Sequence, residues 1–143
     1  MYDTVLVPTD GSARSRAAAR RAIGLAGASG GSIRALSVIE VDDLGLWTAA
    51  DVPVERVRAS LRDAAEMAVE EIASLAGDAG VDCATEIRIG VPYREILDAT
   101  AEADADLVVM ATHGRTGLEH AILGSTTERV VRLSDVPVLT VRE

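Results

Sequence analysis

Glycines and hydroxyl side chains gather in one stretch of the chain, THGRTGLEHAILGST at residues 112–126. Gly114 and Gly117 can adopt positive φ angles and bring bare backbone close to a ligand. Consecutive backbone N–H groups in such turns form a concave anion site. A helix that starts at Ser125, within the GST of residues 124–126, would add free N–H groups and a positive dipole end. The stretch is therefore a candidate phosphate-binding loop.

The same stretch also allows a purely structural interpretation. Ser125 and Glu128 have the spacing of a capping box, in which a serine and a glutamate satisfy the first N–H groups of a helix. The stretch is not a P-loop, because no lysine follows its glycines, and the GxGxxG pattern of dinucleotide-binding folds is missing. Phosphate binding and helix capping both remain open at this point.

Residues for other kinds of active site are missing from the sequence. His113 and His120 are the two histidines, and neither comes with the cysteine or carboxylate spacing of a zinc site. The GxSxG elbow of a serine hydrolase is absent. The single cysteine, Cys83, is expected to be a buried, inert thiol, and we expect the acidic residues of segment 42–53 to be solvated.

The elements around this stretch alternate along the chain. Continuous apolar runs predict buried strands at residues 3–8, 33–41, 82–89, 106–110 and 138–141. Four helices are predicted. The first follows an N-cap at Ser12, the second spans residues 53–77, the third opens at Pro92, and the fourth spans residues 125–133. Such alternation indicates an α/β fold, an open parallel five-stranded sheet with helices on both faces, in a single domain of residues 1–143.

Ligands of open parallel sheets bind beyond the carboxyl ends of the strands, where the strand order reverses. The loop PTDGS (residues 8–12) follows the first predicted strand, and ATHGRTG (residues 111–117) follows the fourth. If these two strands are neighbours, the two loops face each other across one crevice.

The composition limits the partners of the protein. The 143 residues carry a net charge of -9, which argues against a broad electrostatic surface for nucleic acid or an anionic membrane. No apolar run approaches the ~20 residues that cross a bilayer. A single cysteine precludes an intramolecular disulfide, and we expect a cytoplasmic protein.

VLVPTDGS at residues 5–12 and the tail of residues 111–143 resemble the universal stress protein family over essentially the whole chain. In its ATP-binding branch the family motif reads Gly, two residues, Gly, nine residues, Gly, then Ser or Thr. Gly114, the nine-residue spacing and Gly124-Ser125 match this motif, whereas Ala111 stands in place of its first glycine. The resemblance implies a Rossmann-like fold, similar to that of the adenine nucleotide alpha-hydrolases, with strand order 3-2-1-4-5.

The resemblance also implies the roles of individual residues in binding ATP, with Mg²⁺ held through the phosphates. Asp10 would lie near the ribose or the phosphate-bound metal, and Val38 would meet the adenine through its backbone. Without the resemblance, the sequence favours a turn residue at Asp10 and a solvated loop charge at Arg115. The implied nucleotide-binding residues are Pro8, Thr9, Asp10, Val38, Met110, Ala111, His113, Gly114, Arg115, Gly117, Gly124, Ser125 and Thr126.

These expectations together describe a nucleotide-responsive regulatory module that is read by an unidentified protein partner. The sequence offers no evident general base opposite a γ-phosphate, so we expect at most slow ATP hydrolysis and no catalytic residues. One alternative is a nucleotide-independent dimeric interaction protein with a pocket weakened at Ala111. Another is an adenine nucleotide hydrolase, although the chain lacks an additional substrate domain.

Because the apolar strand at residues 138–141 would be a sheet edge, and because the family pairs through this strand, we expect a homodimer.

Overall fold

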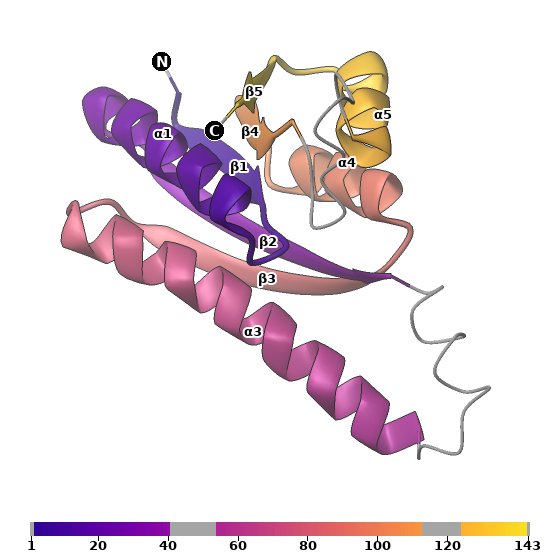
Figure 1. Cartoon of the computed structure of the whole chain (residues 1–143). Coiled ribbons are helices and arrows are strands. Elements are labelled where there is room, and N and C mark those ends of the chain that lie inside the picture. The colour runs from indigo at the N-terminus through magenta and orange to yellow at the C-terminus, as the bar shows by residue number, and fades with distance from the viewer. Residues whose placement is uncertain (1, 41–53, 113–123, 143) are drawn as a thin grey trace.

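An open sheet of five parallel strands lies at the centre of the protein (Figure 1). The computed structural model describes residues 2–40, 54–112 and 124–142. The strand order is β3-β2-β1-β4-β5, which confirms the predicted order. The strands are β1 (Thr4–Pro8), β2 (Ser32–Glu40), β3 (Cys83–Gly90), β4 (Leu107–Ala111) and β5 (Val138–Val141). The helices are α1 (Ala13–Ser29), α3 (Val54–Asp78), α4 (Pro92–Glu102) and α5 (Ser125–Leu133).

Helices cover both faces of the sheet, as predicted. Helices α1 and α3 lie on one face, and α4 and α5 lie on the other (Figure 1). Along β1, Val5 and Val7 pack toward α1 and α3, whereas Leu6 packs toward α4 and α5. All three side chains are fully buried. A strand buried on both faces must be apolar at every position, and this explains the continuous apolar run in the sequence.

Helix α1 begins where the sequence predicts, and a glycine ends it. Ser12 is its N-cap, and the serine side chain accepts a hydrogen bond from the backbone N–H of Ser15. Gly30 ends the helix in the left-handed conformation, with φ of 69°. The N–H of Gly31 then donates to the carbonyl of Ala26 at 2.8 Å, the long hydrogen bond of a Schellman motif.

Apolar periodicity correctly predicts the long helix α3, and Pro92 correctly predicts the start of α4. Val57, Ala65, Ala68 and Ile72 form the buried stripe of α3. Pro92 occupies the first turn of α4, where its missing N–H leaves no hydrogen bond unmade. No described helix is long and apolar enough to span a membrane.

Gly31 provides a test of the connection between α1 and β2. A Cβ atom at this position would collide with the backbone carbonyl of Tyr2. We expect Gly31→Ala to lower the free energy of unfolding by about 2 kcal/mol, the size of an overpacking penalty. Gly24→Ala is the matched control, because a Cβ there meets no atom within 4 Å and alanine favours an exposed helix by up to about 1 kcal/mol. Urea denaturation of both variants checks that the free energy of unfolding falls in Gly31→Ala and rises in Gly24→Ala.

Candidate functional site

The strand order reverses between β1 and β4, at the centre of the sheet. Val5 pairs with Leu107 and Leu6 pairs with Val108, so the two strands run parallel and end at the same edge. From β1 the sheet continues to β2 and β3 on one side, and to β4 and β5 on the other. The predicted neighbourhood of the first and fourth strands is therefore confirmed.

The end of β1 is held against β2. Pro8 closes the strand, and Thr9 follows it as a buried residue whose N–H donates to the carbonyl of Leu36 at 2.8 Å. The hydroxyl of Thr9 accepts a hydrogen bond from the N–H of Gly11 at 3.1 Å. Gly11 has φ of 82°, a conformation that glycine adopts without strain, and it turns the chain into α1.

Asp10 is fixed by the first turn of α1. Its Oδ1 atom accepts hydrogen bonds from the Ser12 N–H at 3.0 Å and from the Ser15 hydroxyl at 2.7 Å. Asp10 therefore has the structural role of a turn residue, one of the two roles that the sequence left open. Its contact with a ribose or a phosphate-bound metal remains a prediction.

The end of β4 carries two further predicted site residues. Met110 and Ala111 are buried, on opposite faces of the sheet: Ala111 packs toward α1, and Met110 packs toward α4 and α5. Beyond them, the N–H of Thr112 donates to the carbonyl of Val141 at 3.1 Å, which ties this strand end to β5.

The start of α5 is attached directly to the end of β4. The N–H of Gly124 donates to the carbonyl of Thr112, and the Thr127 hydroxyl donates to the carbonyl of Ala111 at 2.8 Å. The first N–H groups of a helix lack partners within the helix and lie at its positive end. Ser125 and the half-buried Thr126, in the first turn of α5, consequently lie at the edge where the strand order reverses.

The capping-box alternative for Ser125 is wrong. The N-cap of α5 is Gly124, whose carbonyl accepts the Glu128 N–H at 2.9 Å, and Ser125 is the first helical residue. Gly124 has an extended backbone and its N–H is bound by the Thr112 carbonyl, so the N-cap lies one residue before the serine that the capping box requires. Glu128 pairs instead with Arg132 at 3.0 Å, one turn along the helix. The predicted range of the helix itself, residues 125–133, is confirmed.

Four predicted phosphate-binding residues, His113, Gly114, Arg115 and Gly117, lie outside the described residues, as does segment 42–53. Val38 lies in β2, half-buried, and packs against the core beneath α4. In the parts of the chain that the structure describes, no group of three or more histidine, cysteine or acidic side chains could hold a metal ion.

Cys83, predicted to be buried, is only half-buried at the start of β3. Burial raises the pKa of its thiol above the ordinary value, with a smaller upward contribution from Glu70 that a backbone hydrogen bond opposes. Because the thiolate is the reactive form, a raised pKa agrees with the predicted inert thiol.

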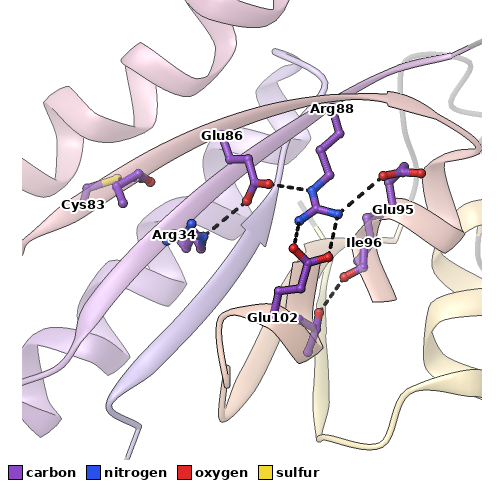
Figure 2. A network of polar contacts seen from close by, with 9 residues as sticks. Arg34, Cys83, Glu86, Arg88, Glu95, Ile96 and Glu102 are labelled. Atoms are coloured by element: carbon purple, nitrogen blue, oxygen red, sulfur yellow. Dashed lines mark hydrogen bonds and ion pairs between the residues drawn. The ribbon is translucent and has the colours of Figure 1, made fainter. Parts of the chain in front are cut away.

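A cluster of charged residues on β2, β3 and α4 is not among the predicted site residues (Figure 2). The guanidinium of Arg88 binds Glu86 at 2.6 Å through Nε, and both carboxylate oxygens of Glu102 at 3.0 and 3.2 Å. Glu95 lies 3.5 Å from the same guanidinium, and Arg34 binds the other oxygen of Glu86 at 3.3 Å. These contacts join β2 and β3 to α4.

Hydrogen bonding to Glu102, and then to Glu86, raises the pKa of the Arg88 guanidinium above its already high ordinary value. Arg88 therefore stays protonated, as arginine does in proteins generally. The sequence signal for this cluster is the pattern TEIRI at residues 85–89. Glu86 and Arg88 are two residues apart in it, and residues two apart on a strand share one face. Since Arg88 pairs with Val38 in the strand register, the cluster supports the strand from which Val38 would meet an adenine.

The fold and the site together define an open α/β protein whose candidate site lies at the strand-order reversal. The model of the universal stress protein family matches residues 1–142, so the chain belongs to the universal stress protein family. The chain is 36% identical over 143 residues to the universal stress protein MJ0531 of Methanocaldococcus jannaschii, covering 100% of this chain and 84% of that protein.

Solved structures show the same similarity in three dimensions. The protein MJ0577, from Methanocaldococcus jannaschii, superposes with a TM-score of 0.87 at 27% identity, covering 100% of this chain and 97% of that one. A universal stress protein crystallised in complex with cAMP superposes with a TM-score of 0.70 at 26% identity, covering 99% of this chain and 97% of that chain.

Removing Arg88 tests whether the charged cluster stabilises the sheet edge. Arg88→Met keeps an apolar stem but leaves three carboxylates close together without their shared guanidinium. Because the Arg88 side chain is only 16% exposed, we expect a loss of about 2 kcal/mol in the free energy of unfolding. Arg62→Met, which breaks an exposed pair with Glu66, should cost less than about 0.5 kcal/mol. Equal losses in chemical denaturation would contradict a special role for the cluster.

Proposed function

We propose that the protein binds an adenine nucleotide, ATP with Mg²⁺, at the edge of the sheet where β1 and β4 end. The observation that carries this proposal is the attachment of α5 to the end of β4 through Gly124 and Thr127. This attachment sets the positive end of a helix at the end of β4, the strand next to β1, and a helix N-terminus favours a phosphate.

The cAMP complex of a related universal stress protein supports the choice of an adenine nucleotide. On this proposal the adenosine lies against the ends of β1, β2 and β4, and the phosphates lie at the start of α5. The adenosine-side residues are Pro8, Thr9, Asp10, Val38, Met110 and Ala111. The phosphate-side residues are Gly124, Ser125 and Thr126, together with His113, Gly114, Arg115 and Gly117 from the stretch outside the described residues.

Ala111, which replaces the first glycine of the family motif, is compatible with this pocket. The residue belongs to β4, and it is not among the described residues that adopt a positive φ, so alanine introduces no backbone strain there. Its methyl group packs in the core beneath α1, on the face of the sheet opposite α5. The methyl group of Ala111 therefore does not point toward the start of α5, where we propose that the phosphates bind.

The proposed role is that of a regulatory module in stress responses, in which nucleotide binding selects a conformation that a protein partner recognises. The competing hypothesis is an interaction protein that works without a nucleotide. The two hypotheses differ in one measurable respect, which is whether the purified chain binds ATP.

Calorimetric titration of nucleotide-stripped protein with ATP, ADP and AMP in Mg²⁺ tests the proposal. We expect micromolar affinity for ATP and a loss of at least about tenfold in Arg115→Asp, because an arginine–phosphate pair becomes a repulsive one. Arg20→Asp makes the same change of charge on the exposed face of α1 and should leave the affinity unchanged. Absence of binding at millimolar ATP would refute nucleotide binding and favour the interaction protein.

We further propose that the chain forms a homodimer through β5. This strand lies at the edge of the sheet and pairs with β4 on one side. Leu139 on β5 is 37% exposed, and Val131 and Leu133 on α5 are also exposed. An apolar edge strand offers backbone hydrogen bonds and side-chain contacts to a second copy.

Sedimentation analysis at micromolar concentration tests this homodimer. The wild-type protein should sediment as a dimer, and Leu139→Glu should sediment as a monomer, because a carboxylate at the interface would be desolvated. Met67→Glu is the matched control on α3, where Met67 is 74% exposed, and it should remain dimeric. A monomeric wild-type protein would overturn the proposal.

A further inference from the structure

Ser15 has a hydroxyl group that the N-terminal cap of α1 does not require. The capping hydrogen bond runs from the backbone N–H of Ser15 to the hydroxyl oxygen of Ser12, at 3.2 Å. The hydroxyl of Ser15 is instead directed at Asp10: it donates to Oδ1 at 2.7 Å and accepts the Asp10 N–H at 3.3 Å. It also accepts a hydrogen bond from the Ser12 hydroxyl at 3.2 Å. Ser15 is only 4% exposed, so solvent does not compete effectively for these bonds.

The resulting network differs from an ordinary capping box. In a capping box, the side chain of the third helical residue reaches back to the N–H of the N-cap. Here Ser15 is the third helical residue, but the N–H of Ser12 is bound by Asp10 at 3.0 Å, from a position before the helix. Oδ1 of Asp10 consequently accepts two hydrogen bonds from the first turn of α1, which limits rotation of the carboxylate about its side-chain bonds.

We propose that Ser15 is a positioning residue of the nucleotide site, which holds the Asp10 carboxylate in the orientation in which it meets the nucleotide. The inference rests on the proposed function, because it requires that Asp10 contact the bound nucleotide or its metal. A carboxylate that is already oriented loses less conformational freedom on binding, and this increases affinity without any direct contact from Ser15. Supporting residues of this kind commonly contribute about tenfold to binding.

A double-mutant cycle separates positioning from general stabilisation. ATP affinity is measured by calorimetry in the wild-type protein, Ser15→Ala, Asp10→Asn and the double variant. We expect Ser15→Ala to weaken ATP binding about tenfold when Asp10 is present, and to have little effect when Asp10→Asn is already in place. An equal loss in both backgrounds, or no loss in either, would overturn the inference.

Thr100→Val is the matched control for deleting a buried hydroxyl. Thr100 is 6% exposed, and its hydroxyl donates to the carbonyl of Ile96 at 2.7 Å within α4. Thr100→Val deletes one buried hydroxyl, as Ser15→Ala does, although the Ser15 hydroxyl makes three hydrogen bonds, to Asp10 and Ser12, and the Thr100 hydroxyl bonds only within α4. We expect a stability loss in thermal unfolding from both variants and a loss of ATP affinity from Ser15→Ala alone. A similar affinity loss in Thr100→Val would assign the effect to general destabilisation.

A crystal structure of Ser15→Ala provides the second measurement and does not depend on nucleotide binding. We expect the Asp10 carboxylate to turn away from the N–H of Ser12 when the Ser15 hydroxyl is absent. An unchanged Asp10 would overturn the inference even if the affinity falls. Failure of the wild-type protein to bind any adenine nucleotide would instead refute the proposed function, and the two failures are therefore distinguishable.

Discussion

The parallel pairing of β1 with β4 is the constraint on which the rest of the structure depends. β1 is bordered by β2 on one side and β4 on the other, and helices cover both of its faces. The strand order reverses between these two strands, and the strand ends that could hold a ligand therefore meet there. An additional strand inserted between them would separate Thr9 from Ala111 and divide the site.

Two helices begin at this edge, and the chain attaches them in different ways. The start of α1 is held by side chains, through the hydrogen bonds among Asp10, Ser12 and Ser15. The start of α5 is held largely by the backbone of β4, with Gly124 as an N-cap that has no side chain of its own. The first arrangement orients a carboxylate, whereas the second caps the helix without a side chain.

Much of the fold could be predicted because its determinants are local. Pro92 and Gly30 mark a helix start and a helix end, and the apolar run of β1 reports burial on both faces. The cap of α5 could not be predicted in the same way, because the contact between Gly124 and Thr112 depends on tertiary structure. The sequence pattern around Ser125 is a genuine capping-box pattern, and only the attachment to β4 moves the N-cap to Gly124.

The candidate site shows the same division between local and tertiary determinants. Pro8, Thr9 and Met110 could be placed at strand ends from the apolar runs alone. The orientation of Asp10 depends on the buried hydroxyl of Ser15, and the Arg88 cluster depends on the approach of α4 to β3. Spacing in the sequence does not determine either contact.

The Arg88 cluster has a consequence for how this sequence can diverge. One guanidinium contacts three carboxylates that come from β3 and from both ends of α4. Loss of the arginine alone would leave these acids to repel one another, and loss of the acids alone would leave a half-buried cation. Positions 86, 88, 95 and 102 should therefore be replaced together over evolutionary time, so that descendants carry either the whole charged set or an apolar one.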